Sequence, residues 1–207
     1  RFVPMSNQAG QSNLRARLTG MGLTVDRADP ALGRILDRIK TREAEGYSYD
    51  TAQASFELLA REELGQLPDF FEVKRYRVTV ERRKNKYDKM ISLSEAVVVV
   101  KVDGEKLLSV SESMDETGSD RGPVNALSKA LSKDLGRYSA HLEDLRLVDF
   151  KVRITQGGTE ADTRVIIDSE DGQGRRWSTV GVSANIVDAS FEALLDAIKW
   201  KLIRDVV

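Results

Sequence analysis

Few side chains in this sequence could carry catalysis. It holds one histidine, His141, and no cysteine, which excludes thiolate nucleophiles, disulfides and cysteine zinc sites. His141 stands beside Glu143 and Asp144, but no serine lies in a nucleophile-elbow motif, so a Ser-His-Asp triad has no support. We therefore interpret His141 as a surface histidine, and we expect neither catalytic residues nor a metal site in this chain.

Three polar segments could bind ions or phosphate, but each has a simpler interpretation. The segment 157–159, Gly-Gly-Thr, could offer backbone amides to an anion, yet it lies between two expected strands and lacks the lysine of a P-loop. The basic run 82–86 has acidic neighbours and is expected to be a solvated loop. Asp115, Glu116 and Asp120 could hold a hard cation, but the glycine and serine among them favour a mobile loop over a cation site.

The overall composition narrows the class of protein. About 41% of the 207 residues are apolar, which is enough to bury a core. The 32 basic and 33 acidic residues nearly cancel, so the totals do not indicate a strongly basic nucleic-acid binder. No run approaches the roughly 20 apolar residues of a membrane span, and we expect a cytoplasmic protein. Because Arg1 is an unusual first residue, we also expect a fragment of a longer chain.

The first third of the chain has the apolar spacing of three short amphipathic helices. We expect them at residues 14–21, 30–46 and 50–65. Asp50 with Gln53 three residues later resembles a capping box for the third helix. Three short helices make a poor core, so their apolar faces need another surface. Residues 1–67 are therefore expected to be a helical connector and not a catalytic domain.

From Pro68 onward the apolar period changes from 3.6 to 2 residues, which is typical of strands. The expected strands are Tyr76–Val80, Ala96–Val102 and Lys106–Val110. Asp103-Gly104 between the last two is a strong hairpin signal. Gly122-Pro123 then predicts the start of a helix. The sequence therefore predicts one βββα unit over residues 68–145.

The same order recurs in the last third of the chain. Strands are expected at Val148–Ile154, Thr163–Ile167 and Trp177–Val182, with a closing helix at Phe191–Leu202. Residues 76–80 match 150–154 at an offset of 74, and residues 125–131 match 192–198 at an offset of 67. We assign the difference to a longer first loop at residues 83–93. The sequence thus predicts an α+β fold in which a helical connector precedes two pseudo-symmetric βββα units, the second over 146–207.

Several separated motifs resemble the C-terminal regulatory domain of the isopropylmalate and citramalate synthase family. They are GPVNAL at 122–127, DFKVRI at 149–154, GT at 158–159, TRV at 163–165 and WSTVGVSANI at 177–186. Upstream segments are similar to the connector of the citramalate branch in particular. These are SNQAGQSN at 6–13, EGYSYDTA at 45–52 and ASFELL at 54–59. The resemblance therefore covers nearly the whole chain.

The resemblance implies a domain of two βββα units that forms a homodimer and binds the pathway's end product, isoleucine or leucine. In the family, an N-terminal TIM barrel condenses acetyl-CoA with a 2-oxo acid on a divalent metal, which a His-x-His pair helps to hold. That pair is absent here. The resemblance thus implies the regulatory end of an acyltransferase, without cofactors of its own. It implies neither a nucleic-acid partner nor a membrane.

A branched aliphatic amino acid needs an apolar slot and polar groups for its zwitterion. With the resemblance, the candidate effector-binding residues are Asp149, Phe150, Val152, Ala161, Thr163, Thr179, Gly181, Val182 and Ile186. For Phe150, Val152 and Val182 a plain role in the core is the open alternative.

A second class of function also fits the order of elements. Three strands followed by a helix occur in double-stranded-RNA-binding domains, and residues 82–89 are basic. The net charge of −1 and the lack of a basic patch before either closing helix weigh against a βββα nucleic-acid-binding module.

Overall fold

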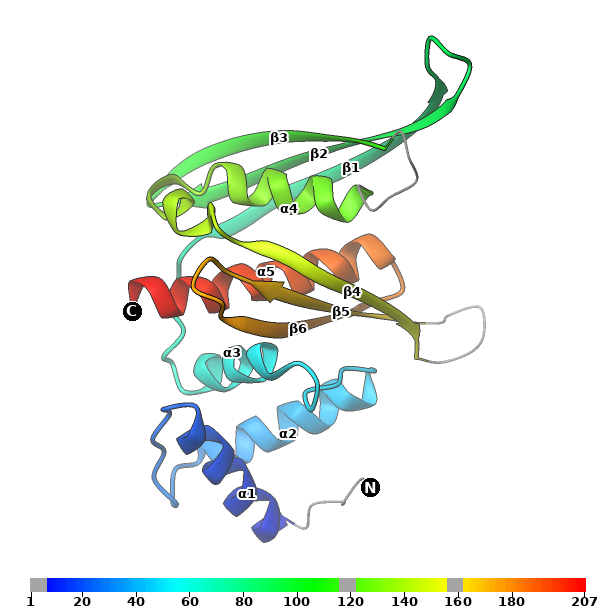
Figure 1. Cartoon of the computed structure of the whole chain (residues 1–207). Coiled ribbons are helices and arrows are strands. Elements are labelled where there is room, and N and C mark those ends of the chain that lie inside the picture. The colour runs from blue at the N-terminus through cyan, green and yellow to red at the C-terminus, as the bar shows by residue number, and fades with distance from the viewer. Residues whose placement is uncertain (1–6, 116–121, 156–161) are drawn as a thin grey trace.

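The computed structural model describes residues 7–115, 122–155 and 162–207 (Figure 1). Three helices come first, namely α1 (Asn7–Gly20), α2 (Ala31–Ala44) and α3 (Gln53–Glu63). Unit one comprises β1 (Glu72–Lys84), β2 (Met90–Val102), β3 (Glu105–Asp115), α4 (Pro123–Lys133) and the 3-10 helix η1 (Gly136–Leu142). Unit two comprises β4 (Arg146–Ile154), β5 (Thr163–Glu170), β6 (Arg176–Ser183) and α5 (Ile186–Val206). The predicted α+β fold, with helices followed by two βββα units, is confirmed.

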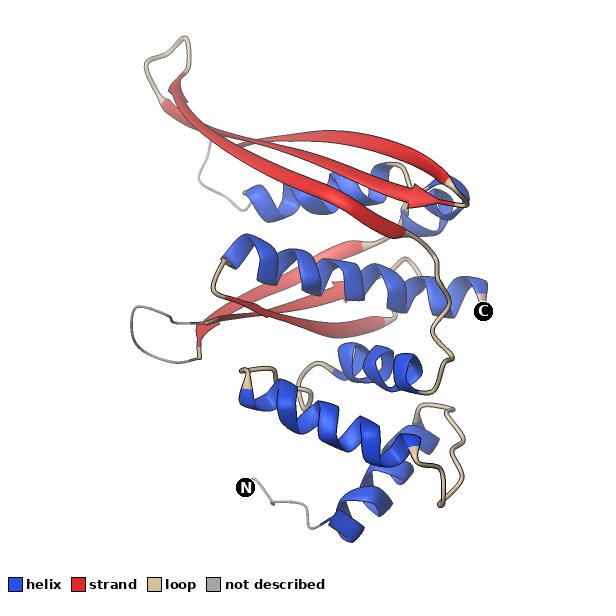
Figure 2. Cartoon of the chain, turned by 180° about the vertical axis from the view of Figure 1, so that it is seen from behind, coloured by secondary structure: helices blue, strands red, loops and turns tan. Residues whose placement is uncertain are grey.

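The elements are stacked in layers, which Figure 1 and Figure 2 show from opposite sides. Sheet A has the strand order β1–β2–β3 and sheet B the order β4–β5–β6, both antiparallel. Helices α4 and α5 lie between the sheets, where one apolar core joins both units. Helix α3 lies on the other face of sheet B, and α2 and α1 follow beyond it. Within the described ranges, no helix combines the length and apolar character needed to cross a membrane.

The Asp103-Gly104 turn forms the predicted hairpin between β2 and β3. Both residues have positive φ, 50° for Asp103 and 90° for Gly104. Two-residue hairpin turns with this geometry match the right-handed twist of the flanking strands. On the two strands, residues with buried side chains alternate with more exposed ones, and Val98 and Val100 of β2 are 1% and 2% exposed. The turn residues and the two-residue alternation of buried side chains thus both specify the β2–β3 hairpin.

The predicted long loop at residues 83–93 is wrong. Strands β1 and β2 continue through most of it, and Lys84 pairs with Met90. The turn itself is short because the Asn85 side chain accepts hydrogen bonds from the backbone N–H groups of Tyr87 and Lys89, at 2.9 and 3.1 Å. The extra residues of unit one therefore lengthen a hairpin. Most of the basic run at 82–86 is exposed, as predicted, but it begins in β1 and is not a loop throughout.

The helices α1–α3, called the connector helices below, bury their apolar faces against one another and against sheet B. Their shared core includes Val180 of β6, and Ile166 and Val182 pack at its margin. This confirms that the three helices need another surface. Helix α3 is the innermost of them, and seven consecutive residues, 54–60, are buried.

The capping box predicted for the third helix is wrong. Helix α3 begins at Gln53 itself, and its N-cap Ala52 has no side-chain cap. The Asp50 side chain instead forms an ion pair with Arg17 at 4.0 Å, and Arg17 also donates a hydrogen bond to the carbonyl of Tyr49 at 2.6 Å. A contact from α1 therefore takes the place of the local cap. Helix α1 is also longer than predicted, since it begins at Asn7.

Candidate functional site

The candidate effector residues lie around sheet B but on both of its faces. Phe150, Val152 and Thr163 share register rows with residues that face α5, whereas Asp149 and Val182 lie on rows of the opposite face. Ile186 is the first residue of α5, and Ala161 lies outside the described residues. One chain therefore does not gather the whole candidate set into a single slot, and the site stays a prediction.

Two of the candidates are in direct contact with α5. The hydroxyl of Thr179 donates a hydrogen bond to the carbonyl of Ala193 at 2.8 Å. A Cβ added at Gly181 would lie 1.9 Å from the carbonyl oxygen of Ala189, so only glycine lets the helix approach the strand this closely. Thr179 is fully buried. At these two positions the helix backbone occupies the space that a ligand would need.

The exposed apolar candidates lie on β4. Phe150 is 36% exposed and Val152 is 42% exposed, and their neighbour on the same face, Ile154, is 72% exposed. We call these three residues the β4 strip. Ile186, at the start of α5, is 45% exposed. The β4 strip is thus the part of the candidate site that is open to an apolar ligand.

Asp149 lies on the other face of β4 and already has partners. Its carboxylate accepts a hydrogen bond from the backbone N–H of Phe150 at 2.8 Å, and Lys151 lies 3.0 Å away. Lys151 also pairs with Asp168 at 2.9 Å. The hydrogen bonds from Lys151 and from the Phe150 amide hold the pKa of Asp149 below its usual value. Asp149 is therefore ionised at neutral pH.

The sequence reasoning missed a polar interface between α5 and the connector helices. The α5 residues that form it recur every four positions: Glu192, Asp196, Trp200 and Arg204. A cavity of about 100 Å³ lies in this interface, lined among others by Arg38, Tyr49 and Asp196. The four-residue period was a usable signal, because polar residues at that spacing lie on one side of a helix.

Glu192 joins the connector helices to the edge strand of sheet B. Its carboxylate accepts hydrogen bonds from the hydroxyl of Tyr47 at 2.7 and 2.8 Å and from Arg42 at 3.1 Å. It also accepts one from the backbone N–H of Val182 at 3.1 Å. Burial and the bond to Glu192 raise the pKa of Tyr47 well above its usual value, so its hydroxyl stays a donor. Glu192 thus satisfies an edge-strand amide and binds two connector residues at once.

Ser55 of α3 bridges α5 and β6 in the same way, one turn of α5 beyond Glu192. Its hydroxyl donates to Asp196 at 2.6 Å and accepts a hydrogen bond from the N–H of Val180 at 3.0 Å. Nearby, Glu57 of α3 is 2% exposed and binds Arg204 at 2.6 and 3.0 Å. Burial opposes the charge of Glu57, but its hydrogen-bond donors outweigh burial and hold its pKa below its usual value. The connector helices are therefore fixed to α5 by charged hydrogen bonds as well as by apolar packing.

Asp196→Asn is expected to flatten the pH dependence of stability. Burial raises the pKa of Asp196 from 3.8 to about 7, against the hydrogen bond from Ser55. Since the folded state holds this proton more tightly, its stabilising effect is full below about pH 4 and is lost as the pH rises through 7, at up to ~1.4 kcal/mol per pH unit. Urea unfolding between pH 4 and 8 checks this. Equal slopes for the variant and the unchanged chain would contradict it.

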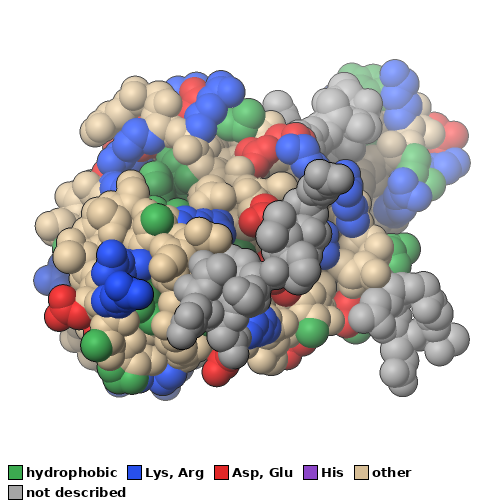
Figure 3. All heavy atoms as spheres, turned by 90° about the horizontal axis from the view of Figure 1, so that it is seen from below, with side chains coloured by type: hydrophobic (Ala, Val, Ile, Leu, Met, Phe, Trp, Pro, Cys, Tyr) green, Lys and Arg blue, Asp and Glu red, His purple; other side chains and the backbone are tan. Residues whose placement is uncertain are grey.

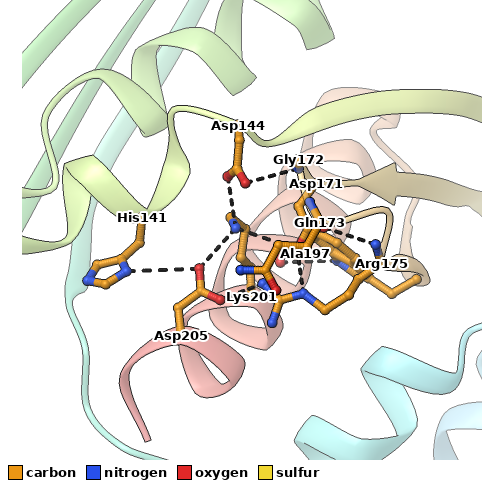
Figure 4. Close-up of polar contacts among 10 residues, drawn as sticks. His141, Asp144, Asp171, Gly172, Gln173, Arg175, Ala197, Lys201 and Asp205 are labelled. Carbon is orange, nitrogen blue, oxygen red and sulfur yellow. Dashed lines mark hydrogen bonds and ion pairs between the residues drawn. The ribbon is translucent and has the colours of Figure 1, made fainter.

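A second cluster surrounds the buried ammonium of Lys201, which is 1% exposed (Figure 4). Asp144 and Asp205 each lie 2.9 Å from it, and the fully buried carboxylate of Asp171 lies 3.7 Å away. Arg175 pairs with Asp171 and Asp205, both at 2.5 Å. Three carboxylates from the end of unit one, from the β5–β6 turn and from α5 are thus held together by two cations.

His141 stands at the margin of this cluster. Its Nδ1 lies 3.9 Å from Asp205, and its side chain is 38% exposed. In the parts of the chain that the structure describes, no group of three or more histidine, cysteine, aspartate or glutamate residues has an arrangement that could hold a metal ion.

Comparisons with known proteins agree with the resemblance seen in the motifs. Residues 50–202 match the family described as the LeuA allosteric (dimerisation) domain. The chain is 41% identical to (R)-citramalate synthase of Aquifex aeolicus over 207 residues, which cover 99% of this chain and 37% of that protein. It is 41% identical to (R)-citramalate synthase of Geobacter sulfurreducens over 202 residues, covering 97% and 36%. It is 30% identical to 2-isopropylmalate synthase of Pseudoalteromonas atlantica over 154 residues, covering 73% and 28%.

The chain therefore spans little more than a third of the length of the curated citramalate synthases that it matches. The match includes both βββα units and helix α3. On this evidence, the chain belongs to the family of LeuA allosteric dimerisation domains, the regulatory domain of citramalate and isopropylmalate synthases.

Proposed function

We propose that this chain provides dimerisation and feedback inhibition to an acyl-CoA-condensing synthase of branched-chain amino-acid biosynthesis, acting in the cytoplasm. The parent would be a citramalate synthase, because the relatives that match almost the whole chain bear that name. An isopropylmalate synthase is the alternative, since relatives with that name match parts of it. The effector would be isoleucine in the first case and leucine in the second.

The divalent metal that this chemistry needs does not fit the residues described. The place where three carboxylates converge is filled by the ammonium of Lys201 and the guanidinium of Arg175. We therefore assign metal and acetyl-CoA to the TIM barrel of the parent enzyme and derive no catalytic step from this chain.

The observation that carries the effector proposal is the open β4 strip. Most of β5 and β6 is covered, by α5 on one face and by the connector helices on the other, whereas β4 is exposed along most of its length. Phe150, Val152 and Ile154 remain 36–72% exposed, and the next strand begins at Thr163, which pairs with Ile154 and offers a hydroxyl. An apolar surface beside a polar group is what a branched aliphatic zwitterion needs. We propose that the β4 strip, Thr163 and Ile186 contact the effector.

Dimerisation would cover the face of sheet A that is turned away from α4. Leu108 is 58% exposed, Val110 37% and Met114 42%, and Val97 and Val99 beside them are half-buried. Val97, Val99, Leu108 and Val110 are register neighbours and form an apolar patch, with the Arg77–Glu95 ion pair beside it. An apolar patch on a sheet is usually covered by a partner, and a second copy of the chain covers it symmetrically.

Light scattering at micromolar concentration is therefore expected to give twice the 23.1 kDa of one chain. Leu108→Lys should raise the dimer dissociation constant about tenfold or more, because it places a charge in the buried face. Val80→Lys is a matched control, since Val80 is 53% exposed but lies on the opposite face of sheet A. The mass of a single chain for the unchanged protein would contradict dimerisation through this domain.

Nucleic-acid binding has less support. Lys84, in the basic run, pairs with Asp88 at 2.8 Å. Basic and acidic side chains are also interspersed on the surface seen from the α1 end in Figure 3. A nucleic-acid interface needs a patch of one sign.

A further inference from the structure

The turn between α2 and α3, residues 45–52, contacts unit two at two separate places. We call it the connector turn. One contact is made by Gly46 and the other by Tyr47, so they are adjacent in sequence. Both contacts reach the ends of strands that border the proposed effector site.

The first contact is with the β4–β5 hairpin. Arg164 of β5 donates a hydrogen bond from its Nε to the carbonyl of Gly46. Gly46 has a φ of +108°, and a Cβ there would lie 3.0 Å from the hydroxyl of Thr155. Thr155 directly follows the β4 strip and is joined to the carbonyl of Asp162 by its backbone N–H at 2.9 Å and its hydroxyl at 3.0 Å. The connector turn therefore packs on the base of this hairpin.

The second contact is with β6 through α5. The Tyr47 hydroxyl binds the Glu192 carboxylate, which accepts the backbone N–H of Val182. Val182 is the register partner of Arg164 across β5 and β6. The two contacts therefore meet at one pair of strand residues, at the end of sheet B where Thr163 and Ser183 also pair.

We propose that the connector turn senses occupancy of the effector site, with Arg164 and Glu192 as the coupling residues. This inference rests on the proposed effector site. A ligand that contacts the β4 strip and Thr163 acts on residues directly beside Thr155 and Arg164. Because Arg164 is bonded to the connector turn directly and Val182 is linked to it through Glu192, a shift of this strand pair changes both contacts together. Ligand binding is then coupled to how rigidly α2 and α3 are held, and the coupling is reciprocal.

Hydrogen exchange measured by mass spectrometry tests this on the whole chain, with and without saturating isoleucine and, separately, leucine. In the unchanged chain the effector should slow exchange in residues 31–63 as well as in β5 and β6. Tyr47→Phe keeps the ring but removes the bond to Glu192, and Arg164→Lys keeps the charge but removes the Nε donor. Both variants should still bind the effector, with affinity changed by no more than about tenfold, and should lose at least about half of the slowing in residues 31–63.

Tyr87→Phe is the matched control for the tyrosine variant, because Tyr87 is 69% exposed in the β1–β2 turn. It should behave like the unchanged chain. Effector binding without slower exchange in residues 31–63 would overturn the coupling and leave the proposed function standing. Undiminished slowing of exchange in residues 31–63 in both variants would also overturn the coupling. Melting curves of the two variants check that each is folded. Absence of any binding to the unchanged chain would overturn the effector site and this inference together.

Discussion

Lys201→Met is expected to destabilise the fold by about 3–5 kcal/mol, because it leaves buried carboxylates without their cation. The Lys201 ammonium is almost fully buried and lies near Asp144, Asp171 and Asp205. Burial opposes its charge, but its hydrogen bonds to Asp144 and Asp205 outweigh burial and raise the pKa of Lys201 above its usual value. Urea unfolding at pH 7 measures the loss.

Lys89→Met is the matched control for this variant. Lys89 is exposed in the β1–β2 turn, so the same change of side chain should alter the free energy of unfolding by no more than about 0.5 kcal/mol. A loss below about 1 kcal/mol for Lys201→Met would show that Arg175 alone balances the carboxylates. It would contradict the conclusion that both cations are needed to hold the three carboxylates together.

Gly181→Ala is expected to destabilise the fold by about 3 kcal/mol, because a Cβ cannot fit between β6 and α5. The added atom would lie 1.9 Å from the carbonyl oxygen of Ala189 and 3.1 Å from the backbone nitrogen of Ala193, so the helix itself has to move. Gly33→Ala is the opposite case. Gly33 lies inside α2 with open space around it, and alanine there should stabilise the fold by about 0.5–1 kcal/mol.

Thermal or urea unfolding of both glycine variants checks the contrast. A loss for both, or for neither, would contradict the packing described for α5. The result also bears on the effector site. If Gly181→Ala lowers stability as expected, position 181 is a packing site, and mutations that test the ligand are better placed on the β4 strip.

Much of the fold could be predicted from the sequence because local signals agree with the tertiary structure. Alternation on the strands, the Asp103-Gly104 turn and the proline at the start of α4 each determine a local conformation that the fold keeps. The internal repeat then gave the order of the two units. The capping box failed because a distant residue, Arg17, pairs with Asp50 in place of a local cap. The long loop failed because the local Asn85 side chain closes a short turn instead.

The candidate site was harder to predict for a related physical reason. Periodicity identifies apolar faces, so Lys201, between Ile198 and Leu202 on the buried side of α5, gave no signal of its role. Its partners Asp144 and Asp171 come from other elements. The sequence predicts ligand contacts at Thr179 and Gly181, and the structure shows both residues packed against α5. Whether a strand residue packs against a helix or binds a ligand depends on where the helix lies. The sequence of a single strand does not contain that position.

A titration with isoleucine tests the central claim, that this chain is an effector-binding regulatory domain, most directly. At a hundredfold excess over Kd, a ligand that binds only the folded state adds about 2.7 kcal/mol of stability. For a chain of this size that raises Tm by about 5–10 °C. We expect saturable heat in calorimetry and this shift with isoleucine, a smaller shift with leucine and none with lysine. No heat and no shift with millimolar isoleucine or leucine, or an equal shift with lysine, would contradict the account.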